Sequence, residues 1–265
     1  MDSLTVVIAT RDRPADLDAC LRALVGADDG RLAEIVVVDD GSRQPVALEP
    51  TIEGRPVVVL RHEVSTGPDR CRNEAVQVAG GDFVAFLDDD ARVAPDWFSV
   101  AGAAIESGMR AFTGRVLPLD RGLVSRSRQW RYDQRYGHLV PGQPVDFLAG
   151  GNSVVAREAF LQAGGFPERK AGGDNGLVGR LRQVGVDCRF VPGMRILHRN
   201  SKGFATAARQ AWHAGRAASP APLAVTVREC ATALARLGAA PVDVRIVNGA
   251  LQLLHSAGRI PRKAA

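Results

Sequence analysis

The sequence predicts an α/β protein with a mostly parallel sheet flanked by helices, followed by a C-terminal helical extension. Over the first 100 residues, short apolar runs rich in β-branched residues alternate with amphipathic segments, the pattern of right-handed βαβ units. After about residue 202 the pattern is helical to the end, with breaks at Pro220, Pro222 and Pro241. The 265 residues, 46% apolar and 24% charged, are enough to bury a large core and exclude disorder or a fibrous repeat.

Each element follows from local periodicity and from the residues that end it. Pro14 suits the first turn of a helix, because its missing N–H is not needed there. The helix that begins at Pro68 ends at Gly80-Gly81, a glycine stop. The sequence thus predicts strands at 4–9, 34–38, 57–60 and 82–87, helices after Pro14 and Pro68 and at 154–165 and 174–185, one or two strands within 186–198, and mixed structure over 111–148.

Polar residues follow three of the predicted strands directly. They are Thr10-Arg11, Asp39-Asp40 and Asp88-Asp89-Asp90. Ligands of such sheets bind outside the carboxyl ends of the strands, so we expect these clusters to converge on one crevice. Three adjacent carboxylates repel one another unless a cation lies among them, and oxygen ligands select Mg²⁺ or Mn²⁺. Taken alone, the three acids also fit a solvated turn that caps the next helix.

Composition and missing motifs exclude several functional classes. The four cysteines form no C-x-x-C pair and are predicted to be buried thiols. The few aromatic residues, 5%, argue against nucleic-acid binding. No G-x-x-x-x-G-K-[ST] loop and no G-x-G-x-x-G after the first strand is present, which argues against a P-loop NTPase or a dinucleotide dehydrogenase. The start of the chain has no basic leader and no apolar run is long enough to cross a bilayer, so a cytoplasmic location is expected.

Positive charge is concentrated towards the C-terminus. Residues 199–265 carry ten Lys and Arg against two acids, a net charge of +8, which leaves about −3 on the first 198 residues. One interpretation is a packed or self-associating helical face, including a homodimer through the C-terminal helices. The other is peripheral contact with an anionic membrane, at its inner face. The apolar stripe that favours packing is Leu234, Leu237, Val244, Val247, Leu251 and Leu254.

Five segments in order resemble family 2 glycosyltransferases, which have the GT-A fold. They are Val36 to Ser42, Cys71-Arg72-Asn73, Gly81 to Asp90, Phe147 to Asn152 with Gly164 to Glu168, and Gly173 to Leu181. The resemblance covers about 200 residues and leaves the last 60 or so outside. It implies a GT-A-like domain at 1–200, with a nucleotide-sugar half at 1–100 and an acceptor half at 101–200, followed by the helical extension at 201–265.

The resemblance also implies a set of donor and metal residues. Asp40 is expected to accept a hydrogen bond from the N–H of a keto base, which favours a uracil, thymine or guanine nucleotide (a UDP-, dTDP- or GDP-sugar) over adenine. Asp90 is the expected direct ligand of Mn²⁺ or Mg²⁺, with Asp88 and His198 as further ligands. His198 alone also fits a structural histidine. The expected donor-binding residues are Ala9, Thr10, Arg11, Asp40, Arg70, Asp88, Asp89, Arg199 and Lys202.

On the acceptor side the resemblance implies an inverting transfer. Asp174 is the expected base for the acceptor hydroxyl, and Gly151 and Asn152 are expected to contact the acceptor. Asp174 also fits a helix N-cap. Gly173 and Gly176 stand where the family usually has acids, and this motivates an alternative: a catalytically decayed nucleotide-sugar-binding or scaffold protein on the same fold. The function predicted is a metal-dependent glycosyltransferase whose acceptor the sequence does not identify.

Overall fold

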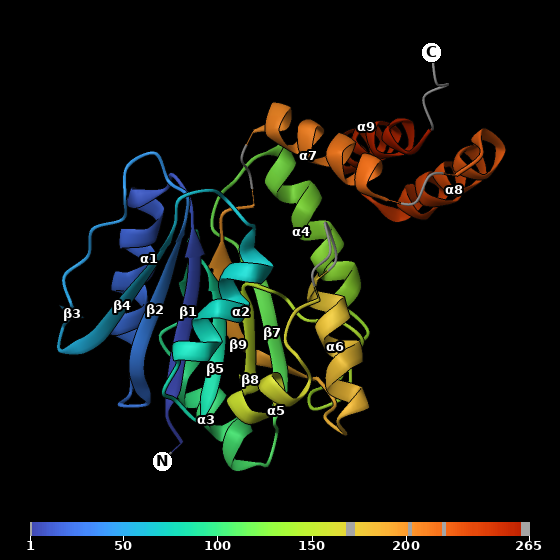
Figure 1. Cartoon of the computed structure of the whole chain (residues 1–265). Helices are drawn as coiled ribbons and strands as arrows, with labels where there is room; N and C mark the ends of the chain where they lie inside the picture. The colour runs from blue at the N-terminus through green and yellow to red at the C-terminus, as the bar shows by residue number, and fades with distance from the viewer. Residues whose placement is uncertain (1, 168–172, 201–202, 219–220, 261–265) are drawn as a thin grey trace. The chain divides into compact units, whose positions relative to one another are not determined.

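The computed structural model describes residues 2–167, 173–200, 203–218 and 221–260 (Figure 1). The chain forms two compact units. The first unit comprises residues 1–117 and 139–198, and the second comprises 118–138 and 199–265. The division at residue 198 lies close to the boundary expected near 200, but the sequence did not indicate that 118–138 belong with the C-terminal helices.

One sheet organises the first unit. Within the described residues its strand order is β3-β4-β2-β1-β5-β8-β7-β9-β6. The strands are β1 (Leu4–Thr10), β2 (Leu32–Asp40), β3 (Thr51–Ile52), β4 (Arg55–His62), β5 (Phe83–Asp88), β6 (Ala91–Val93), β7 (Ala111–Pro118), β8 (Asn152–Ala156) and β9 (Arg189–His198).

The expected mostly parallel sheet is found in only part of this order. β1 pairs in parallel with β2 and β5, and β2 with β4, as the βαβ pattern predicts. β8 pairs antiparallel with β5 and β7, and β6 pairs antiparallel with β9. The predicted helix at 154–165 is partly wrong, because its first residues form the fully buried end of β8 and only α5 (Arg157–Gln162) is helical. A short apolar run fits a buried strand and a buried helix equally well.

Helices cover both faces of the sheet. They are α1 (Pro14–Ala27), α2 (Pro68–Val78), α3 (Trp97–Glu106), α5 and α6 (Gly173–Gln183). In Figure 1, α2 and α5 lie in front of the sheet, and α1 and α3 lie behind it. Prolines stand in the first turns of α1 and α2, as predicted. α1 buries Leu17, Leu21 and Leu24, each worth about 1.5–3 kcal/mol of transfer free energy. The four cysteines are free and buried, as expected.

The second unit is helical. Its elements are α4 (Leu123–Tyr136), α7 (Phe204–Ala217), α8 (Leu223–Ala235), the short 3₁₀ helix η1 (Arg236–Ala239) and α9 (Val242–Arg259). α9 packs against α4, α7 and α8. Val244 and Val247 of the predicted apolar stripe are buried inside the chain, so this part of the stripe packs within one molecule. A homodimer through these helices stays a prediction. No helix among the described residues is long and apolar enough to span a bilayer.

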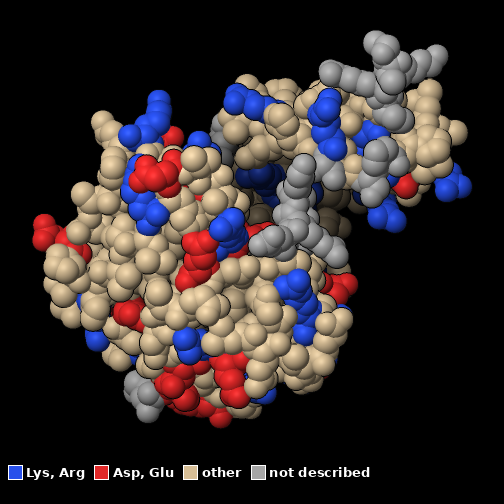
Figure 2. All heavy atoms as spheres, in the orientation of Figure 1, with Lys and Arg blue, Asp and Glu red and all other residues tan. Residues whose placement is uncertain are grey.

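Charge separates between the two units. The second unit contains fifteen Lys and Arg against four Asp and Glu, a net charge of +11, and the whole chain is +5, so the first unit is −6. Figure 2 shows several Lys and Arg side chains on the visible face of the helices of the second unit. The net charge of the second unit exceeds the +8 of residues 199–265, because residues 118–138 add five arginines and two acids.

Candidate functional site

The carboxyl ends of three central strands meet at one edge of the sheet. In the strand register Ala9 lies beside Val38 and Asp88, and Thr10 lies beside Asp39. The polar clusters that follow β1, β2 and β5 are therefore neighbours, as the sequence predicts. Ala9 is half-buried, Thr10 is buried and Arg11 is exposed.

Two arginines neutralise part of the acidic cluster after β5. Arg13 contacts Asp89 at 2.8 Å and Asp90 at 3.0 Å. Asp89 also accepts a 2.8 Å hydrogen bond from the Thr10 hydroxyl. Burial nevertheless raises the pKa of Asp89, although the charge of Arg13 and the hydrogen bond from Thr10 oppose the shift. On the other side of the cluster Arg72 donates to Asp88 at 2.9 Å.

Arg13 and Arg72 are not among the site residues predicted from the sequence. Arg72 lies within a quoted motif, and Arg13 follows β1 by three residues at the edge where the acids were expected. The sequence did contain a reason to expect them. Carboxylates packed this closely need cations nearby, and Arg13 follows the strand edge while Arg72 lies on α2.

Asp88, Asp90 and His198 form a compact set of metal-ligating atoms. Nε2 of His198 lies 3.0 Å from Oδ1 of Asp90 and 3.5 Å from Oδ2 of Asp88. One ligand atom from each residue lies within 4.8 Å of the other two. His198 comes from the end of β9, which reaches this edge by pairing with β6. Two carboxylates and an imidazole fit a divalent ion such as Mn²⁺.

His198 carries a proton in the absence of such an ion. Burial alone would lower its pKa, but the hydrogen bonds and negative charges of Asp88 and Asp90 outweigh this and raise the pKa to about 10. The same groups act on Asp88, where burial opposes ionisation and the contacts with His198 and Arg72 leave the pKa lowered. A metal ion bound here would replace the imidazolium proton as the cation among the acids.

Gly151 and Asn152 lie beside this cluster at the start of β8. A Cβ atom at Gly151 would stand only 2.3 Å from Oδ2 of Asp88, so glycine leaves the carboxylate its space. The expected acceptor contact of Asn152 does not fit the structure, because this residue is fully buried. Its amide nitrogen donates to the carbonyls of Arg115 and Met194, each at 2.9 Å. Its oxygen accepts from the Trp97 indole at 2.9 Å, so Asn152 joins strands instead.

Asp40 organises the loop between β4 and α2. It accepts hydrogen bonds from the Ser65 hydroxyl at 2.6 Å and from the Thr66 and Gly67 amides at 2.6 and 3.1 Å. Burial opposes ionisation, but these hydrogen bonds outweigh it and lower the pKa of Asp40 to about 2. Asp40 is therefore a permanent anion at this edge, and its contact with a nucleotide base stays a prediction.

The remaining predicted residues are spread over both units. Arg70 is exposed on α2 and pairs with Glu74 at 3.0 Å. Arg199 is exposed in the second unit, and Lys202 lies outside the described residues. Asp174 belongs to the first turn of α6, but its side chain lies outside what the structure describes. A Cβ at Gly176 would stand 2.4 Å from Cγ of Pro167, so packing here leaves no room for the acid that the family usually has at that position.

Comparison with known proteins identifies the family. The family model described as glycosyl transferase family 2 matches residues 5–163. The chain belongs to this family. A pre-mycofactocin glycosyltransferase of Mycobacterium tuberculosis is 29% identical over 235 residues, covering 84% of this chain and 47% of the relative. An uncharacterized glycosyltransferase of Haemophilus influenzae is 32% identical over 87 residues, 33% of this chain and 29% of the relative. The chain thus spans about half the length of the mycobacterial relative, or less than a third of the other.

Solved structures share the GT-A fold of this family member. A mannosyltransferase of Pyrobaculum calidifontis in complex with GDP-Man and Mn²⁺ aligns with a TM-score of 0.61 at 18% identity, over 97% of this chain and 73% of that one. GalNAc-T7 with UDP, GalNAc and Mn²⁺ aligns with a TM-score of 0.59 at 19% identity, over 75% and 44% of the two chains. Both likenesses support the predicted fold.

Proposed function

We propose that this chain is a metal-dependent, inverting glycosyltransferase that moves a sugar from a nucleoside diphosphate sugar to an acceptor hydroxyl. The observation that carries the proposal is the cluster of Asp88, Asp90 and His198, which lies at the strand edge beside Thr10 and Asp40. Family membership supports it, as do the structural neighbours that were solved with UDP or GDP-Man together with Mn²⁺.

The donor is proposed to lie along this edge. Asp90, Asp88 and His198 would hold Mn²⁺ or Mg²⁺, which supplies Lewis-acid stabilisation of the departing diphosphate when bound. Thr10, Arg11 and Asp40 would surround the base and ribose. Asp40 is ionised and can accept from the N–H of uracil, thymine or guanine, but its oxygens already serve the 65–67 loop. We therefore expect the nucleotide base to donate one further hydrogen bond to Asp40, in addition to those from the 65–67 loop.

The transfer is proposed to be a single displacement. The acceptor oxygen attacks the anomeric carbon from the face opposite the diphosphate, and the bond from that carbon to the diphosphate oxygen breaks with its electron pair on the leaving group. The carboxylate of Asp174 takes the proton of the acceptor hydroxyl. Arg199 and Lys202 would add positive charge near the leaving diphosphate.

The alternative of a decayed binding or scaffold protein rests on Gly173 and Gly176. The packing of Gly176 against Pro167 gives that glycine a structural reason and weakens the alternative. The surroundings of Gly173 lie outside what the structure describes, so the case against the alternative rests on Gly176. Turnover of a nucleotide sugar with Mn²⁺ separates the two functions, because a scaffold would bind the donor without consuming it.

Calorimetry with UDP, dTDP, GDP and ADP, each with and without Mn²⁺, tests the donor and the metal together. We expect one of the three keto-base nucleotides to bind best and only when Mn²⁺ is present. Asp90→Asn should abolish the Mn²⁺-dependent part of binding. Asp18→Asn, which removes an exposed carboxylate paired with Arg22 on α1, is the matched control and should bind normally. Equal affinity of Asp90→Asn and wild type with Mn²⁺ would contradict the metal assignment.

Location and further partners belong to the same proposal. A cytoplasmic location is proposed, with peripheral contact between the basic second unit and a membrane. A homodimer is proposed through the apolar stripe of the C-terminal helices. The acceptor is proposed only as a hydroxyl compound, and no nucleic-acid partner is expected.

A further inference from the structure

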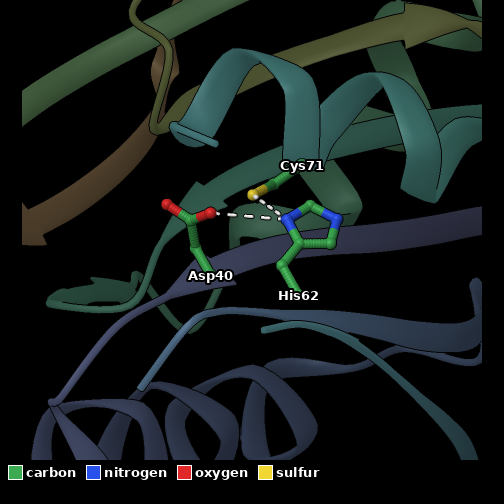
Figure 3. Close-up of side chains that lie close together, drawn as sticks. All are labelled: Asp40, His62 and Cys71. Carbon is green, nitrogen blue, oxygen red and sulfur yellow. Dashed lines mark hydrogen bonds and ion pairs between the residues drawn. The ribbon is translucent and has the colours of Figure 1, made fainter. Parts of the chain in front are cut away.

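A second cluster of metal-ligating side chains lies close to the end of β2. Asp40 ends β2, His62 ends β4 and Cys71 lies in the first turn of α2. Asp40 and His62 are partners in the parallel register of the two strands, and α2 brings the thiol over them. Figure 3 shows Nδ1 of His62 directed at both the Asp40 carboxylate and the Cys71 sulfur. Among the described residues, this cluster and the one at Asp88 are the two sets of three such groups close enough to share an ion.

The distance between His62 and Asp40 suits a shared ion better than a direct hydrogen bond. Nδ1 of His62 lies 3.4 Å from Oδ1 of Asp40 and 3.8 Å from Sγ of Cys71. In an N–H···O hydrogen bond the nitrogen and oxygen usually lie within about 3.2 Å of each other. The contact between His62 and Asp40 is longer than this. Ligands of a tetrahedral zinc, at about 2.0 Å for N and O and 2.3 Å for S, lie roughly 3.3 to 3.6 Å apart. The observed separations are within a few tenths of an ångström of that geometry.

His62 is oriented as metal-binding histidines are. Its Nε2 contacts the Glu74 carboxylate, which is itself paired with Arg70. A carboxylate that accepts the Nε2 proton fixes the tautomer whose Nδ1 lone pair faces the cluster, and this arrangement is recurrent around protein metals. The side chain of His62 is 14% exposed, which gives an ion a path from solvent, whereas Cys71 is fully buried.

A fourth donor lies next to these three. The hydroxyl of Thr66 is 2.9 Å from Nδ1 of His62, 3.3 Å from Oδ1 of Asp40 and 3.9 Å from Sγ of Cys71. Without an ion, this hydroxyl lies at hydrogen-bond distance from Nδ1. With an ion in the cluster, the hydroxyl or a water in its place would complete a tetrahedral set. Asp40 can ligate through one lone pair while it keeps its hydrogen bonds to the 65–67 loop.

We propose that Asp40, His62 and Cys71 form a second metal site, selective for Zn²⁺ over Mn²⁺ and Mg²⁺. The selectivity follows from the ligands: a thiolate and an imidazole favour Zn²⁺, whereas the carboxylate-rich cluster of Asp88, Asp90 and His198 suits a harder ion. Zn²⁺ would displace the thiol proton of Cys71 on binding. The zinc site lies at the ends of β2 and β4, and the site of Asp88, Asp90 and His198 lies at the ends of β5 and β9. The two sites prefer different metals.

The site has a consequence for the donor. Because Asp40 is also expected to contact the nucleotide base, Zn²⁺ at this position should weaken nucleotide binding even when Mn²⁺ is present. This consequence rests on the proposed function, whereas the existence of the zinc site does not. If Zn²⁺ binds at this site but does not weaken nucleotide binding, the zinc site stands and the expected contact of Asp40 with the base is wrong.

Cobalt substitution tests the site directly. Titration of the full chain with Co²⁺ should produce the intense visible bands of a tetrahedral ion together with a near-ultraviolet thiolate-to-cobalt charge-transfer band, and Zn²⁺ should displace both. Cys71→Ser should remove the charge-transfer band. Cys188→Ser, which removes another buried thiol, and Asp90→Asn should retain it. Circular dichroism and a thermal melt without metal establish that each variant is folded.

A second variant avoids the buried thiol altogether. Glu74→Gln keeps the shape of the carboxylate that orients His62 and should weaken Zn²⁺ about 10- to 100-fold, the usual cost of losing such a partner. Glu63→Gln, which changes an exposed carboxylate next to His62 in the sequence, should bind as the wild type does. Absence of the charge-transfer band in the folded wild type, its survival in Cys71→Ser, or equal zinc affinity of Glu74→Gln and Glu63→Gln would each overturn the proposal.

Discussion

Gly151 determines how much room the carboxylate of Asp88 has. A Cβ atom at position 151 would stand 2.3 Å from Oδ2 and 2.5 Å from Cγ of Asp88, far inside van der Waals contact. Gly151→Ala should therefore push Asp88 away from His198 and weaken Mn²⁺-dependent nucleotide binding by about 10-fold or more, a loss of roughly 1.4 kcal/mol. Calorimetry with the best-bound nucleotide and Mn²⁺ measures the change.

Gly26→Ala is the matched control for this substitution, because a Cβ on that residue of α1 meets nothing within 4 Å. It should leave nucleotide affinity unchanged. If Gly151→Ala binds the nucleotide with Mn²⁺ as tightly as the wild type does, the position of the Asp88 carboxylate does not determine metal binding.

The proposed role of Asp174 as a base can be tested by a substitution that keeps the shape of its side chain. Asp174→Asn keeps the size and polarity of the side chain but cannot accept a proton. Donor binding should survive, while transfer to the acceptor falls by about 10²- to 10⁴-fold, the usual scale for losing a general base. Steady-state turnover of the nucleotide sugar, once an acceptor is found, measures the effect, and near wild-type turnover would assign the proton to another group.

The sequence predicted which residues gather at the strand edge but not all of their roles. Asp88, Asp90 and His198 could be named because acids after a strand and a histidine after another strand match a family motif. Arg13 could not be predicted, since nothing local shows that it reaches acids 76 and 77 positions away. Asn152 was misassigned for the same reason: its partners come from β7, β9 and α3, which a linear motif does not contain.

At the level of elements, β1, β2, β4, β5, α1 and α2 could be predicted because each combines a clear periodicity with its own stop signal. β7 and β8 could not, because their short apolar runs are defined by pairing with each other and with β5 across distant parts of the chain. The parallel part of the sheet is thus a local property of the sequence, and the antiparallel part is a property of the assembled fold.

Two glycines allow α7 and α9 to approach closely. A Cβ at Gly215 would stand 2.0 Å from the backbone oxygen of His255, and one at Gly258 would stand 2.6 Å from that of Trp212. Gly215→Ala should gain about 1 kcal/mol of helix propensity and lose more from backbone overlap, so the free energy of unfolding of the second unit should fall by about 1–3 kcal/mol. Urea denaturation followed by circular dichroism measures it.

The control is Gly179→Ala on α6, where the added Cβ meets nothing within 4 Å. It should be neutral or stabilising by up to about 1 kcal/mol. An unfolding free energy of Gly215→Ala equal to or above that of the wild type would mean that the two helices do not pack this closely in solution.

Over the whole molecule, charge and exposed apolar surface occur together in the second unit. Its net charge of +11 stands against −6 for the first unit. On α9, Val242, Ile246 and Leu253 are 57–68% exposed, and their spacings of four and seven place them on one face of the helix. This face is distinct from the buried one that carries Val244 and Val247. Large apolar side chains on a strongly basic helical unit match the chemistry of an anionic lipid surface.

We therefore predict that the protein pellets with vesicles that contain anionic lipid and not with vesicles of neutral lipid alone. Binding should weaken steeply between about 0.05 and 0.3 M salt, because each Lys or Arg near the bilayer contributes about 1 kcal/mol and this contribution is screened within a Debye length. The double variant Ile246→Ser, Leu253→Ser keeps every charge but removes two of the exposed side chains, so it should pellet less at each salt concentration. Light scattering of both proteins tests the other use of this exposed face. A wild-type dimer that the double variant converts to monomer, without vesicle binding by either, would assign the face of Val242, Ile246 and Leu253 to a second copy of the chain.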